Sequence, residues 1–148
     1  MSLEENKAIV RGLVEAELKH NPALLDEFLA PDFVWTESGI TTRGREIYKQ
    51  GVEIAFKAFP DLHGTIEDIT AEGDKVWIRY KGTGTNTGEW MGLAPTGKKV
   101  TMTAVSIYRI VDTKVVEMWT IMHMDFLKGL GIIKYTEKGK KLFPEDAK

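Results

Sequence analysis

The sequence predicts a single α+β domain in which helices pack against one face of a curved antiparallel sheet. Two observations support this prediction: apolar residues have helix-like spacing up to residue 59, and runs with strand-like alternation follow from residue 63. Helices followed by a succession of strands are typical of α+β domains. The 148 residues, 43% apolar and 28% charged, have the ordinary composition of one globular domain.

Three helices are expected in the first part of the chain. Residues 4–20 place apolar side chains at helical spacing, and an Asn-Pro pair ends that pattern. A short helix over residues 22–29 and a helix over residues 45–59 follow, separated by a short strand candidate at residues 33–36.

Four strands in succession are expected after the helices. They are HGTIEDITAE, KVWIRYKGTG, KKVTMTAVSIYRIV and KVVEMWTIMHMDF, with turns at Gly73-Asp74 and Asp112-Thr113. We expect residues 1–131 to form the domain. Residues 132–148, which carry several lysines, are expected to be a C-terminal extension that is loose or covers a partner subunit.

Composition excludes several functions. Zero cysteines rule out disulfides, thiolate catalysis and cysteine-ligated metals, and the three histidines are scattered without metal-ligand spacing, so no metal site is expected. A net charge of −2 gives no global field to attract nucleic acid or an anionic membrane. No run is long enough for a membrane span, and the acidic N-terminus is unlike a secretory signal, so we expect a cytoplasmic protein.

Three stretches together resemble the SnoaL-like polyketide cyclase branch of the nuclear transport factor 2-like superfamily. They are LLDEFLAPDFVW, AFPDLHGTIEDITAEGDKVWIRYKGTGTNTGEWMGLAPTGKKV, and VVEMW followed by a short stretch ending in GLG. The resemblance spans most of residues 5–131. It implies a cone-shaped fold whose bent sheet wraps its concave face around the N-terminal helices and leaves a pocket at the open end. It also implies a homodimer or higher homo-oligomer that pairs through the sheet.

The resemblance directs attention to the last strand. Cyclases of this branch use a carboxylate about four residues after the tryptophan as acid and base, but here that position is His123 and the nearest carboxylate is Asp125. Strand alternation puts both on the face of Trp119, and a histidine still moves protons near neutral pH. We therefore expect His123 as general acid or base, with Asp125 orienting it or acting as the base. The alternative is that this polar face meets solvent or a subunit interface while the methionine face packs on the core.

Other candidate residues are expected to bind substrate. Glu37 is a second possible proton carrier near the pocket mouth, although an exposed loop glutamate is the alternative. Asn86 stands in the glycine-rich stretch GTGTNTG, where related sequences often carry a histidine. The apolar walls are expected to come from the four tryptophans, which are Trp35, Trp77, Trp90 and Trp119.

These observations favour an acid–base enzyme that needs no cofactor and moves a proton within a small, largely apolar carbonyl compound. Aldol-type ring closure and isomerisation both fit. The competing class is a non-catalytic ligand-binding or assembly domain, which the same fold supports because fold does not imply function. A weaker third hypothesis is epoxide or ester hydrolysis through an activated water. The expected partners are a small apolar ligand and further copies of the chain, with no nucleic acid and no membrane.

Overall fold

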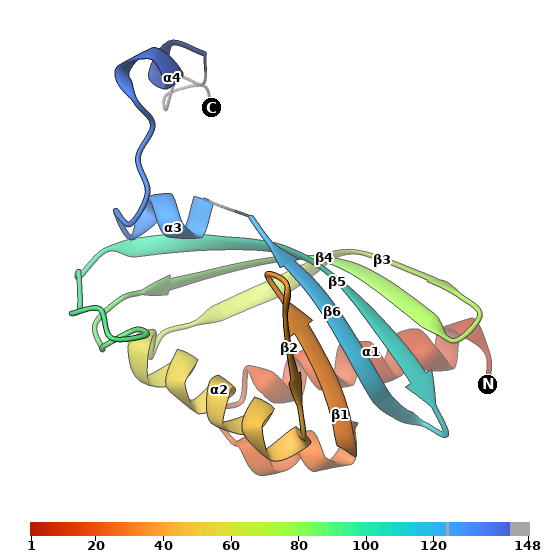
Figure 1. Cartoon of the computed structure of the whole chain (residues 1–148). Helices are drawn as coiled ribbons and strands as arrows, with labels where there is room; N and C mark the ends of the chain where they lie inside the picture. The colour runs from red at the N-terminus through yellow and green to blue at the C-terminus, as the bar shows by residue number, and fades with distance from the viewer. Residues whose placement is uncertain (124, 143–148) are drawn as a thin grey trace.

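The computed structural model describes residues 1–123 and 125–142, in which the N-terminal helices pack beneath one curved sheet (Figure 1). The helices are α1 (Leu3–Glu17), the 3-10 helix η1 (Pro22–Glu27), α2 (Arg45–Ala58), α3 (Asp125–Gly129) and α4 (Glu137–Leu142). The strands are β1 (Leu29–Glu37), β2 (Ile40–Arg43), β3 (His63–Glu72), β4 (Lys75–Thr85), β5 (Lys99–Val111) and β6 (Lys114–Met122). The predicted α+β class is confirmed.

Local sequence signals explain where α1 begins. The Ser2 hydroxyl accepts a hydrogen bond from the backbone N–H of Glu5, and the Glu5 carboxylate accepts one from the backbone N–H of Ser2. This capping box satisfies two backbone donors that a helix start leaves unpaired. The apolar stripe of α1 is then buried in the core.

The six strands form one open sheet in the order β2-β1-β6-β5-β4-β3. Neighbours are antiparallel except β1 and β6, which are parallel, so the expectation of a wholly antiparallel sheet is corrected at this one pair. Strand β1, which follows η1, lies beside the last strand, β6. A local strand pattern does not predict such a long-range pairing. The register of β1 shifts between Leu29 and Val34, and this irregularity accommodates Pro31, which has no N–H for the ladder.

The core lies between the sheet and the helices. Its fully buried side chains come from α1, from η1 and the start of β1, and from the inward faces of β4 and β6, among them Val10, Leu13, Leu25, Leu29, Phe33, Val76 and Val115. A second cluster around Phe59, Val100 and Phe126 closes the end where α3 packs on β5. Within the described residues, no helix is long and apolar enough to cross a membrane.

The C-terminal part of the chain differs most from the sequence prediction. The last strand ends at Met122 instead of continuing to Phe126, and Asp125 begins α3. The Asp125 carboxylate accepts a hydrogen bond from the backbone N–H of Phe126 at 2.8 Å, and such a local side-chain contact competes with strand pairing. The hairpin strand β2 and the short helix α4 were also not predicted. α4 stands away from the sheet (Figure 1).

Candidate functional site

A cavity of about 240 Å³ lies between the inward face of the sheet and helices α1 and α2. Its walls alternate along the strands as the pleat requires: Met118, Thr120 and Met122 face inward from β6, and β4 and β5 contribute in the same way. The helix α2 supplies a stripe with the spacing of successive helical turns. The residues lining the cavity are Val14, Glu17, Leu18, Trp35, Glu37, Tyr48, Gly51, Val52, Ala55, Phe56, Phe59, Leu62, Ile78, Tyr80, Trp90, Met102, Ala104, Ser106, Tyr108, Met118, Thr120, Met122 and Phe126.

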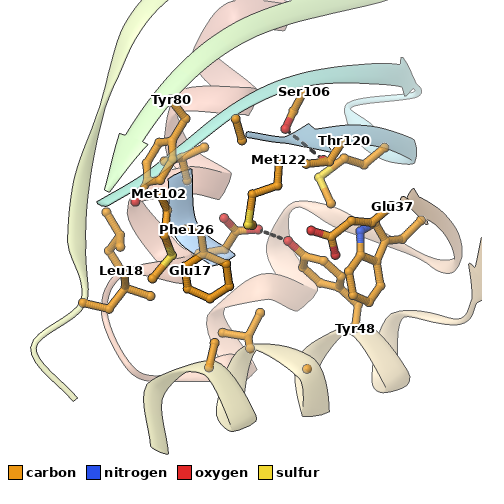
Figure 2. Close-up of a pocket in the computed structure, with 18 of the residues that line it drawn as sticks. Glu17, Leu18, Glu37, Tyr48, Tyr80, Met102, Ser106, Thr120, Met122 and Phe126 are labelled. Carbon is orange, nitrogen blue, oxygen red and sulfur yellow. Dashed lines mark hydrogen bonds between the residues drawn. The ribbon is translucent and has the colours of Figure 1, made fainter. Parts of the chain in front are cut away.

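The chemical centre of this cavity is the pair Glu17 and Tyr48. The Tyr48 hydroxyl donates a 2.5 Å hydrogen bond to Oε1 of Glu17, and Figure 2 shows the two side chains meeting inside the cavity. Removal from water raises the pKa of Glu17 to about 7, although the hydrogen bond from Tyr48 opposes this rise. A carboxyl group with that pKa exchanges a proton near neutral pH, as general acid–base work requires.

Packing holds Tyr48 in place. Its ring contacts Phe33 and Trp35 edge-on, with centroid distances of 5.2 and 5.1 Å. The pKa of Tyr48 is raised well above its usual value, first by burial and then by the nearby charge of Glu17, so the hydroxyl stays protonated. Tyr48 therefore serves as a fixed hydrogen-bond donor.

Glu37 is a second carboxyl group in the same cavity. It lies at the end of β1, and Figure 2 shows it beside Tyr48. Burial raises its pKa, and its charge contributes to the raised pKa of Tyr48. Glu37 therefore lies at the cavity, where the sequence analysis placed it, and its role toward a substrate stays a prediction.

Two hydroxyl groups add polarity to the sheet wall. Ser106 on β5 and Thr120 on β6 are cross-strand partners, and their hydroxyl oxygens are 2.9 Å apart in a hydrogen bond (Figure 2). Burial also raises the pKa of Tyr80, on the neighbouring β4, to about 12. This wall offers neutral hydroxyl groups to a ligand.

His123 and Asp125 lie close to each other but do not line the cavity. Nδ1 of His123 is 3.4 Å from Oδ1 of Asp125, and the Thr103 hydroxyl donates to Oδ2 of Asp125 at 3.1 Å. The His123 side chain is 70% exposed and that of Asp125 is 34% exposed. The expectation that strand alternation turns both into the cavity is wrong, because β6 points its methionine face inward and ends at Met122.

The other predicted binding residues divide into two groups. Trp35 and Trp90 line the cavity as expected, whereas Trp77 and Trp119 do not and are each 45% exposed on the opposite sheet face. Asn86 does not line it either. Its side chain is buried in the loop, where Oδ1 accepts hydrogen bonds from the backbone N–H and hydroxyl of Thr96. Asn86 thus organises the glycine-rich connection.

Glu17 and Tyr48 were missed by the sequence reasoning, and a signal for Glu17 was present. Val10, Leu13, Val14 and Glu17 have the i, i+3, i+4, i+7 spacing of one helix face. Since the first three are buried, Glu17 is carried into the interior on the same stripe. Within the described residues, no group of three or more acidic or histidine side chains is arranged to hold a metal ion.

Comparison with known proteins identifies relatives of this architecture. The family model described as SnoaL-like polyketide cyclase matches residues 7–127. The chain is similar to the crystal structure of AclR, "a putative hydroxylase from Streptomyces galilaeus", with 32% identity over 95% of this chain and 90% of that one, and a TM-score of 0.82. Comparison with curated protein sequences gives no match.

Two further solved structures have the same fold. IdmH, "a putative polyketide cyclase from Streptomyces antibioticus", is 31% identical over 85% of this chain and 98% of that one, with a TM-score of 0.75. The structure of a "Putative SnoaL-like polyketide cyclase from Jannaschia Sp. CCS1" is 23% identical over 89% of this chain and 95% of that one, with a TM-score of 0.80. At that identity it shows the fold alone.

Proposed function

The chain belongs to the SnoaL-like polyketide cyclase family, and from this premise we propose that it is an acid–base enzyme acting on a small, largely apolar carbonyl compound. Glu17 carries the proton, Tyr48 positions Glu17, and no cofactor takes part. One observation supports this most strongly: a carboxyl group with a pKa of about 7 faces an apolar cavity and is hydrogen-bonded to a buried tyrosine.

The proposed reaction is a proton transfer. Ionised Glu17 removes a proton from the carbon next to the carbonyl group, which leaves the electron pair of that C–H bond in an enolate and the proton on Glu17. The protonated carboxyl then returns the proton to the same or another atom, or the enolate carbon attacks a second carbonyl and Glu17 protonates the new alkoxide. Isomerisation and aldol-type ring closure therefore need the same two residues.

The walls of the cavity suit such a substrate. Aromatic, methionine and aliphatic side chains provide most of the lining, and they exclude water from the reacting atoms. A water-poor site also maintains the raised pKa of Glu17. The hydroxyls of Ser106 and Thr120 provide a polar position on the sheet wall at which a carbonyl oxygen can be oriented.

Isotope exchange tests this function without knowledge of the natural substrate. The probe is 1-indanone in D2O, because its two fused rings match a cavity of about 240 Å³, and the readout is deuterium uptake next to the carbonyl by NMR. We expect the protein to accelerate exchange over buffer and Glu17→Gln to lower that acceleration by a factor of about 100 or more. Glu15→Gln, an exposed glutamate on the same helix, is the matched control and should leave it unchanged.

The opposite result would favour a non-catalytic domain. If 1-indanone binds in the cavity, as line broadening of its signals would show, but no acceleration occurs, the protein binds ligands without proton transfer. If acceleration survives in Glu17→Gln, proton transfer occurs through another group and the assignment of Glu17 is wrong.

A further inference from the structure

The two carboxyl groups of the cavity have no cationic partner in the part of the chain that the structure describes. Glu17 is hydrogen-bonded only to neutral Tyr48, and within residues 1–123 and 125–142 neither Glu17 nor Glu37 forms a salt bridge. On the outer face of the sheet, by contrast, Glu67 pairs with Arg79 at 2.6 Å and Glu117 pairs with Arg109 at 3.1 Å. Among the described residues lining the cavity there is no lysine, arginine or histidine.

An unpaired carboxylate in an apolar site is unfavourable, because the surroundings replace neither its hydration nor its counter-ion. Burial raises the pKa of both groups, and the pKa of about 7 means that the protein alone keeps Glu17 partly protonated near neutral pH. A ligand with a positive charge would stabilise both carboxylates directly.

The aromatic lining strengthens this argument. Trp35, Phe56, Tyr80, Trp90 and Phe126 all face the same cavity. The faces of such rings carry negative electrostatic potential and attract ammonium groups, most strongly where water is excluded. Rings and carboxylates together provide the two features with which proteins recognise organic cations.

We propose that this cavity is a binding site for protonated amines, and that the ligand it selects carries an amino group on an apolar body of one or two rings. The inference rests on the cavity being the substrate site of the proposed function, and it specifies the charge of the substrate. The ammonium group contacts Glu17 or Glu37, and the rings of the ligand pack against the methionine and aromatic walls. Anionic ligands bind more weakly, because they place a negative charge beside Glu17 and Glu37.

Three ligands of matched shape test this charge selectivity: 1-aminoindane, 1-indanone and indane-1-carboxylate. Their dissociation constants are measured by calorimetry at about pH 8, where Glu17 is mostly ionised. We expect the amine to bind at least about tenfold more tightly than the ketone, and the carboxylate to bind at least about tenfold more weakly than the ketone. Acidification to about pH 5.5 protonates Glu17 and should reduce the preference for the amine.

Variants identify the groups responsible. Glu17→Gln and Glu37→Gln should each reduce amine affinity several-fold while changing ketone affinity by less than about twofold, and Glu15→Gln should change neither. Equal affinity for amine and ketone in the parent protein would overturn the proposal. So would an amine preference that persists in the double variant Glu17→Gln/Glu37→Gln, because the charge selectivity would then come from elsewhere.

The two proposals fail in different ways. If 1-indanone exchanges its protons through Glu17 but 1-aminoindane binds no more tightly, the acid–base function stands and the amine site is wrong. If the amine is preferred but no exchange is accelerated, the cavity is a binding site for cations and the catalytic proposal is wrong.

Discussion

The Tyr48 hydroxyl donates a 2.5 Å hydrogen bond to Oε1 of Glu17, and this contact joins α1 to α2 inside the cavity. Neither residue belongs to the last strand, to which the family resemblance directs attention. The candidate proton carrier is therefore on the helical side of the cavity, opposite the sheet wall formed by Met118, Thr120 and Met122.

Stability should depend on the ionisation of Glu17. The pKa of Glu17 is about 7 in the folded protein against 4.5 for the free group, so the folded state holds the proton more tightly. The proton on Glu17 therefore contributes to the free energy of unfolding. This contribution is complete below about pH 4.5, and roughly 3 kcal/mol of it is lost as the pH rises through about 7. Glu17→Gln should be within about 1 kcal/mol of the parent near pH 5 and exceed its stability by roughly 3 kcal/mol near pH 8, as measured by urea denaturation.

The exposed glutamate of the same helix is the control for that experiment. Glu15→Gln should show the pH dependence of the parent protein, because the Glu15 side chain is 72% exposed. The quantity to compare is the difference in unfolding free energy between the parent and Glu17→Gln. If that difference is the same at about pH 5 and about pH 8, Glu17 ionises as a free glutamate and the assignment is contradicted.

Tyr48→Phe should raise the pKa of Glu17 further. The hydrogen bond from Tyr48 stabilises the carboxylate, so its loss leaves the effect of burial unopposed. Carbon-detected NMR of the glutamate side chains measures this directly. Tyr80→Phe removes another hydroxyl of the same cavity, one that forms no hydrogen bond with Glu17 among the described residues, and as the matched control it should shift the titration less. A lowered pKa in Tyr48→Phe would contradict the assigned role.

His123→Gln and Asp125→Asn should have little effect on proton exchange. Both residues lie outside the cavity, so we expect the exchange rate of 1-indanone to stay within about twofold of the parent. Asp125→Asn should instead destabilise the protein by about 1 kcal/mol, because Asp125 accepts hydrogen bonds from Thr103 and from the backbone of Phe126. A loss of exchange above about 100-fold in either variant would restore the last strand as the site of proton transfer.

The outer face of the sheet is expected to pair with a second copy of the chain. Trp77, Ile107 and Trp119 are aligned across β4, β5 and β6, and Val105 and Ile121 lie next to them on the same exposed face. An apolar patch of this kind commonly marks an interface. Light scattering should give at least twice the chain mass of 16.7 kDa, and Trp119→Glu should lower it.

A substitution away from that patch controls for the added charge. Ile40→Glu alters an apolar side chain that is 71% exposed on β2, and it should leave the measured mass unchanged. A single-chain mass for the parent protein at micromolar concentration would contradict the expectation.

Local patterns predicted most of the fold because each element carries its own signal. The apolar spacing of α1 and α2 and the turns at Gly73-Asp74 and Asp112-Thr113 are properties of neighbouring residues. The parallel pairing of β1 with β6 was not predictable in this way, because those strands are about 80 residues apart in the sequence and only tertiary packing brings them together.

The site was predicted less well, and for a related reason. The period of two along β6 separates Met118 from Trp119 but does not say which of them faces the helices. The helical spacing of Glu17 with Val10, Leu13 and Val14 places it on the apolar stripe, but that spacing does not show that a cavity lies beside it. Its raised pKa depends on burial under the sheet, which only the folded structure shows.

The pH dependence of 1-indanone exchange tests the central claim most directly, because it links the reaction to the group that carries the proton. We predict that the rate accelerated by the parent protein rises with pH through a midpoint near 7, the pKa of Glu17, and that this rise disappears in Glu17→Gln and persists in Glu15→Gln. A midpoint near 4.5, as for a free glutamate, or an unchanged profile in Glu17→Gln would contradict the claim that Glu17 carries the proton in this cavity.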